Sequence, residues 1–83
     1  MVAKGIIIAT SRSEAHNLRV LAFDRFWVDT SPRSLQQGAL RGVEANPVLM
    51  VYGAVSWRDL MTYLRPAFRG REPEVFHIRR LGQ

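Results

Sequence analysis

The chain contains no cysteine and only one lysine. The absence of cysteine excludes several kinds of site, and the shortage of lysine means that arginine carries most of the positive charge. Without cysteine it can form no disulfide, no cysteine-ligated zinc site, no iron–sulfur cluster and no thiol nucleophile. This composition fits a cytoplasmic protein, which is the location we expect. With Lys4 as the single lysine, arginine supplies the other eleven of the twelve basic residues.

Long hydrophobic runs are also missing. A membrane-spanning helix needs about 20 apolar residues, and no stretch approaches that length. The apolar run at 5–9 is too short for the hydrophobic region of a signal peptide. The composition is otherwise globular, with 47% hydrophobic and 23% charged residues among 83. We therefore expect one compact domain over residues 1–83 and no membrane partner.

The motifs of common enzyme classes are absent as well. The sequence has no G-x-x-x-x-G-K-[ST], no G-x-S-x-G and no G-x-G-x-x-G. His77 has no acid at a metal-ligand spacing, and Glu14 and His16 would diverge on a helix. The seven acids form no recognisable acid–base pair. The sequence thus predicts no enzyme activity, no metal and no cofactor.

Apolar runs alternate with helical patterns along the chain. Strands are predicted at 5–9, 26–28, 48–52 and 75–80, because these runs are apolar or alternating and are bounded by polar or turn residues. Helices are predicted at about 13–25, from 31 to about 42, and from 56 to about 65. Their starts follow from the Ser11–Glu14 capping-box spacing, from Ser31 before Pro32, and from Ser56.

This alternation predicts an α/β fold. We expect a small three-layer sandwich around a mostly parallel four-stranded sheet in the order 2-1-3-4, as in flavodoxin-like or Rossmann-like minimal units. The alternative is an α+β arrangement in which residues 18–23 form a strand instead of part of the first helix.

Two loops of such a sheet carry hydroxyl groups and an arginine at the same edge. In a 2-1-3-4 sheet a crevice opens at the carboxyl ends of the first and third strands. Each loop leads into a predicted helix start, where free N–H groups favour an anion. We therefore predict a phosphate site at this rim, although the serines are also explained as helix caps. The rim residues are Ser11, Arg12, Ser13, Ser56 and Arg58.

A second basic block lies near the C-terminus. Its arginines could track a phosphate backbone while bases stack on the interleaved Phe68. Alternatively, they form a solvated edge that prevents strand-to-strand aggregation. The block consists of Arg65, Arg69, Arg71, Arg79 and Arg80, and the aromatic candidates for a protein interface are Trp57, Tyr63 and Phe68.

The formal net charge of +5 and the pI near 11.1 favour an anionic partner. Our leading interpretation is a small, non-enzymatic, arginine-rich module that binds DNA or RNA through phosphate contacts. The first alternative is a protein-interaction module that meets an acidic protein surface. Such a module would be an accessory or inhibitory subunit of a larger assembly, of the kind that phages and mobile elements encode. The second alternative is a phosphate-handling enzyme built on the rim. Arginine-rich codon usage explains the basic bias equally well.

Overall fold

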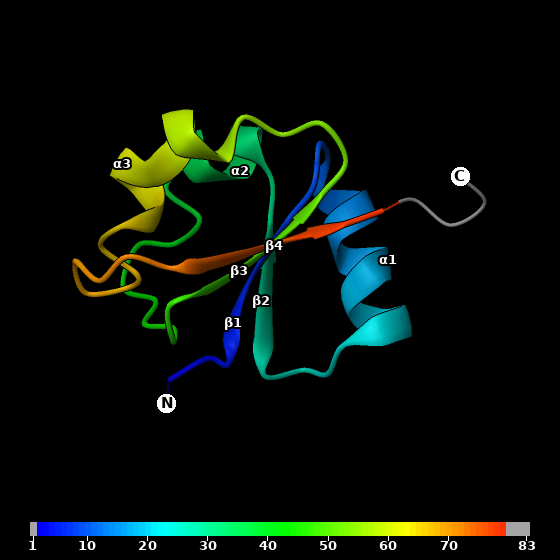
Figure 1. Cartoon of the computed structure of the whole chain (residues 1–83), viewed down its shortest axis with the longest axis horizontal. Helices are drawn as coiled ribbons and strands as arrows, with labels where there is room; N and C mark the ends of the chain where they lie inside the picture. Colours follow the sequence, from blue (N-terminus) through cyan, green and yellow to red (C-terminus); the bar gives the residue numbers. More distant parts are fainter. Residues whose placement is uncertain (1, 80–83) are drawn as a thin grey trace.

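A computed structural model describes residues 2–79, which form a four-stranded, all-parallel sheet in the order β2-β1-β3-β4 (Figure 1). The strands are β1 (Gly5–Ile8), β2 (Trp27–Thr30), β3 (Val48–Tyr52) and β4 (Glu74–Ile78). The helices are α1 (Arg12–Ala22), α2 (Pro32–Gln36), the 3₁₀ turn η1 (Trp57–Leu60) and α3 (Met61–Leu64). The predicted α/β class and the order 2-1-3-4 are confirmed. The α+β alternative is wrong, because residues 18–22 lie in α1.

The central strand β1 is buried on both faces. Ile6, Ile7 and Ile8 have no exposed surface, as expected for a β-branched run between two parallel neighbours. Ile7 points to the face covered by α1, where it packs with Ala15. Ile6 and Ile8 point to the opposite face.

The helices lie on both sides of the sheet, so the described residues form three layers (Figure 1). On the face opposite α1, α2 contributes Leu35 and α3 contributes Leu64 to the larger core, which Phe68 completes. The apolar stripe from Trp57 to Phe68 therefore packs as its helical spacing predicts. The helix ends at Leu64, before Pro66, also as predicted.

Two helices are shorter than predicted. Helix α1 ends at Ala22, because Phe23 adopts an extended conformation with φ −130°. Helix α2 ends at Gln36, and residues 37–42 form turns. Gly38 and Gly42 in this segment have φ values of +85° and +77°, which interrupt helical geometry. Residues of this turn segment line a pocket together with residues of α3.

Gly5 allows the ring of Trp27 to pack directly against the backbone of β1. A Cβ at this position would lie 2.5 Å from Trp27 Cζ3 and 2.8 Å from the Val48 carbonyl oxygen. Glycine therefore lets the Trp27 ring cross the start of β1, where it also meets the Phe23 ring at a centroid distance of 4.8 Å.

Candidate nucleic-acid interface

The start of α1 is capped from within the chain. Ser11 Oγ accepts a hydrogen bond from the Glu14 N–H at 3.2 Å, so Ser11 is the predicted cap. The Glu14 carboxylate accepts hydrogen bonds from Thr10 Oγ1 at 2.7 Å and from Ser11 Oγ at 3.4 Å. A carboxylate thus already lies at the positive end of α1, where it would repel a phosphate. Arg12 and Ser13 are exposed beside it.

The loop after β3 does not form the helix start that the sequence predicts. Ser56 has φ −79° and ψ 70°, and its side chain caps no N–H group. A four-residue 3₁₀ turn follows, and it continues into four residues of α3. The predicted helix start at Ser56 is therefore wrong, and so short an element aligns few peptide dipoles that could attract an anion. Arg58 instead places its guanidinium 5.3 Å from the ring centre of half-buried Trp57.

A cleft of about 710 Å³ does lie at the carboxyl ends of the strands. Its polar lining comes from Thr10, His77 and Arg79 rather than from Arg12 and Arg58. Arg12 lines a separate depression of about 460 Å³ at the β2 edge, together with Arg19, Arg25 and Asp29. The two predicted rim arginines are thus not brought to one cleft.

Asp29 links β2 to α1 within that depression. Its Oδ2 accepts a hydrogen bond from Arg19 Nε at 2.8 Å and lies 3.1 Å from His16 Nδ1. The Asp29 side chain is only 11% exposed. Burial acts to raise the pKa of Asp29, but the hydrogen bonds from Arg19 and His16 outweigh it and lower the pKa. Arg19 therefore links α1 to β2 and stabilises the fold.

Several C-terminal arginines also have partners inside the chain. Arg65 Nη2 lies 3.3 Å from Glu72 Oε1, and both side chains are largely exposed. Arg69 pairs with Glu44, which is more enclosed. Exposed ion pairs of this kind are weak and can exchange for a phosphate, so they do not exclude a ligand.

Arg71 and Phe68 have structural roles. Arg71 Nε donates to the Phe68 carbonyl oxygen at 2.9 Å, and Arg71 Nη2 donates to the Ala45 carbonyl oxygen at 3.4 Å. The Phe68 side chain is completely buried, so the prediction that it stacks on bases or forms an interface is wrong. It fails because Phe68 completes the apolar stripe of the preceding helix. Arg80 lies outside the described residues.

Within residues 2–79, six arginines form neither an ion pair with a carboxylate nor a hydrogen bond to a backbone carbonyl oxygen. They are Arg12, Arg25, Arg33, Arg41, Arg58 and Arg79. Only three of them, Arg12, Arg58 and Arg79, belong to the predicted binding set. These six cations are the charges most available to an anionic partner.

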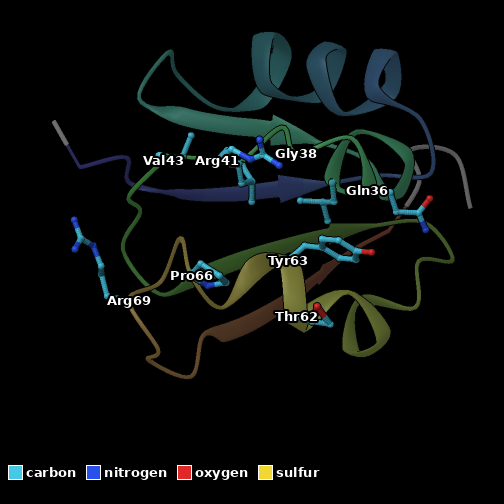
Figure 2. A pocket seen from close by; sticks show the side chains of 11 residues that line it. Gln36, Gly38, Arg41, Val43, Thr62, Tyr63, Pro66 and Arg69 are labelled. Carbon is cyan, nitrogen blue, oxygen red and sulfur yellow. The ribbon is translucent and has the colours of Figure 1, made fainter.

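One of them, Arg41, lies on a groove that the sequence did not predict (Figure 2). The groove has a volume of about 450 Å³ and separates α2 and its turns from α3; we call it the α2–α3 groove. Leu35, Leu40 and Val43 contribute apolar lining. In Figure 2 the Tyr63 ring projects between the two walls, and 40% of Tyr63 is exposed.

Arginines lie on two sides of the α2–α3 groove. The Arg41 guanidinium lies over Gly38, so close that a Cβ there would be 3.6 Å from Arg41 Nε. Arg69 lies at the far end of the groove and points outward in Figure 2. Sequence reasoning named Tyr63 and Arg69 but missed their connection to Arg41. The available signal was Gly38, whose left-handed backbone ends α2 early.

Within the part of the chain that the structure describes, no cluster of histidines and carboxylates could hold a metal ion. No helix in residues 2–79 combines the length and the apolar character needed to cross a membrane.

Comparison with protein-family models, curated proteins and solved structures finds no significant match to this chain. The arrangement of its own residues is therefore the basis for inferring its function.

Proposed function

We propose that this chain is a non-enzymatic module that binds single-stranded nucleic acid, with one base lying in the α2–α3 groove. The observation that carries the proposal is an exposed tyrosine ring in an apolar groove beside an arginine without a carboxylate partner. Aromatic side chains stack on bases of any sequence, because every base has a π-face. Arginine pairs bidentately with phosphate.

The groove suits a nucleotide better than an inorganic anion. Exposed Pro66 and half-buried Val43 offer apolar surface, which an inorganic phosphate could not use. A base against Tyr63 would cover that surface, while Arg41 and Arg69 bind the phosphates on either side. The ion pair between Arg69 and Glu44 would open in the process, at small cost because the Arg69 side chain is 68% exposed.

The remaining unpaired arginines act at longer range. Arg79 lines the cleft at the carboxyl ends of the strands, Arg12 lines the depression at the β2 edge, and Arg58 lies over Trp57. All three add to the attraction of a polyanion. The carboxylate of Glu14 argues against placing a phosphate directly at the start of α1. We therefore assign contact with the nucleic acid to the α2–α3 groove and electrostatic steering to the rim.

Substitutions in the groove test this proposal. We expect Tyr63→Ala to weaken binding of a labelled single-stranded oligonucleotide by about fivefold to a hundredfold, because base stacking contributes about 1–3 kcal/mol. Tyr63→Phe keeps the ring and should bind like the parent chain. Arg41→Ala should weaken binding severalfold. Fluorescence anisotropy at low salt, with DNA and RNA oligonucleotides, measures each effect.

Arg25→Ala is the matched control, because it removes one positive charge outside the groove, beside the Phe26 ring. We expect less than a twofold change for this variant. Equal losses from Arg25→Ala and Arg41→Ala, with no loss from Tyr63→Ala, would show that binding is purely electrostatic and that the groove is not the site. Failure of every oligonucleotide to bind at low salt would reject nucleic acid as the partner.

A protein partner with an acidic surface is the second candidate. It is supported by half-buried Trp57 beneath Arg58 and by exposed Tyr63, since tryptophan, tyrosine and arginine are enriched at interfaces. Salt separates the two candidates. A nucleic acid releases bound counterions, so its affinity falls as the salt concentration rises, whereas a contact centred on Trp57 and Tyr63 changes little with salt.

A further inference from the structure

Strand β4 has an open side. It is the last strand of the sheet order and pairs only with β3 within the described residues. The Glu74 N–H donates to the Pro47 carbonyl oxygen at 2.9 Å, so Glu74 directs its backbone groups toward the sheet. Because this direction alternates along a strand, Phe76 also faces β3, whereas Val75 and His77 direct their N–H and C=O groups outward. These groups can pair with a further strand.

The face of the sheet next to this edge is apolar and incompletely covered. Helix α1 packs mainly against β1 and β2, so Met50 and Tyr52 of β3 are only partly covered on this face and β4 lies beyond the helix. Phe76 lies there in register with half-buried Met50 and is 45% exposed. An exposed phenylalanine in the middle of an edge strand is an aggregation hazard unless another strand covers it.

The charges along β4 indicate which strand could pair with it. Glu72 and Glu74 stand at its beginning, and Arg79 and Arg80 follow it in the sequence. An antiparallel copy of the same segment places its basic end beside this acidic end, and its acidic end beside this basic end. A parallel copy would place like charges together. The segment is thus electrostatically complementary to itself in the antiparallel direction.

We propose that two copies of this chain form a symmetric dimer by antiparallel pairing of their β4 strands, with the two-fold axis at Phe76. Val75 would lie opposite the partner's His77 and exchange both backbone hydrogen bonds with it, because both residues direct these groups outward. Phe76 would lie opposite the partner's Phe76 at a position without hydrogen bonds, where cross-strand side chains are closest. The two four-stranded sheets would become one.

The ends of the proposed ladder are also consistent with this register. Arg79 lies opposite the partner's Pro73, and the neighbouring Glu72 and Glu74 of the partner direct their side chains to the other face of the sheet. Pro73 has no N–H group, so the hydrogen-bonded ladder stops there. The pairing is independent of the proposed nucleic-acid binding, since the α2–α3 groove contains no residue of β4.

Charge-swapped chains provide the decisive test. We expect the parent chain to dimerise with concentration, and the measured mass to rise from 9.5 kDa toward twice that value in sedimentation or light scattering. The double variants E72K/E74K and R79E/R80E should each raise the dimer dissociation constant by about tenfold or more, because like charges then meet. Mixing the two variants should restore association as a heterodimer. This restored association would also show that both variants are folded, because misfolded chains would not form the heterodimer.

Two further measurements locate the contact. His77→Pro removes an outward N–H group and should abolish the dimer while leaving the circular-dichroism spectrum unchanged. Exchange of the Val75 and His77 amide hydrogens should slow as the concentration of the parent chain rises. A parent chain that remains at 9.5 kDa at every concentration would overturn the proposal. So would a dimer that persists in His77→Pro but is lost in Leu21→Glu, since contact would then run through α1.

Discussion

Asp29 joins two elements through hydrogen bonds to side chains that lie one turn apart on α1. Arg19 and His16 both approach the same oxygen, Oδ2, and Arg19 is itself only 21% exposed. Arg19 and Asp29 are both partly shielded from water, so each charge is stabilised by the other, and removal of one would leave the other poorly solvated. This cluster fixes α1 over β1 and β2.

At the residue scale we predict that Asp29→Asn lowers the free energy of unfolding at pH 7 by about 1–3 kcal/mol, because Arg19 loses its charged partner. The pKa of Asp29 is lowered in the folded state, so its contribution is present above about pH 4, the ordinary carboxyl range. The contribution is lost as the pH falls through the folded-state pKa. Urea denaturation at pH 7 and at about pH 3 should show the difference between parent and variant shrinking in acid.

Asp24→Asn is the control for this prediction. Asp24 pairs with Lys4 at 2.6 Å, and hydrogen bonds from Lys4 and from the Phe26 N–H lower its pKa. The Asp24 side chain is, however, 45% exposed, so water can replace its partner. We expect a clearly smaller loss than for Asp29→Asn. Equal losses would mean that Asp29 contributes no more than a surface ion pair.

The elements of this fold differ in how their starts are stabilised. Helices α1 and α2 begin at serines whose hydroxyl oxygens accept an N–H three residues on, from Glu14 and Ser34. The η1–α3 segment begins after Ser56 without such a bond and is held by burial of Leu60, Met61 and Leu64. The same residue type is thus a cap in two places and a surface residue in the third.

At the element scale we predict that two serine-to-alanine changes affect stability to different extents. Ser11→Ala removes the cap of the longest helix and should cost about 1 kcal/mol, which lowers the melting temperature by about 4–8 °C for a domain of this size. Ser56→Ala should change stability by less than about 0.5 kcal/mol, as exposed positions without special contacts do. Thermal unfolding followed by circular dichroism compares the two. A larger loss from Ser56→Ala would contradict the assignment.

Positive charge is spread over the whole molecule rather than collected at one cleft. Arg12 and Arg25 lie at the β2 edge, Arg41 on the α2–α3 groove, and Arg79 at the carboxyl edge of the sheet. Charges so dispersed attract a polyanion from several directions, but only those that meet phosphates release counterions. The slope of log K against log salt therefore reports the number of phosphate contacts and not the net charge of the protein.

At the scale of the whole molecule we predict a modest salt slope for single-stranded nucleic acid. The two phosphate contacts assigned to Arg41 and Arg69 would give a slope of log K against log salt of about −1.4, at about −0.7 per phosphate. Arg41→Ala should reduce the slope by about one contact, and Arg25→Ala should leave it unchanged. Anisotropy titrations at four or five salt concentrations determine it. A slope near zero would mean that no phosphate contact forms, and it would contradict the assignment of Arg41 and Arg69.

Local sequence was sufficient for the secondary structure that depends on near neighbours. The apolar run at Ile6–Ile8 predicted a strand buried on both faces, and Pro66 predicted the end of the third helix. Strand β3 was predicted at its observed bounds, Val48–Tyr52. These features follow from side-chain alternation, caps and proline geometry, which act within a few residues and are readable without a fold.

The sequence by itself therefore determined the alternation of strands and helices, the absence of thiol chemistry and the net charge of +5. The tertiary structure decided which arginines remain available, because ion pairs such as Arg69–Glu44 join residues far apart in the chain. It also buried Phe68 and exposed Tyr63, although both belong to the same basic, aromatic stretch. Partner choice and burial depend on packing between distant segments, and no pattern of neighbouring residues encodes them.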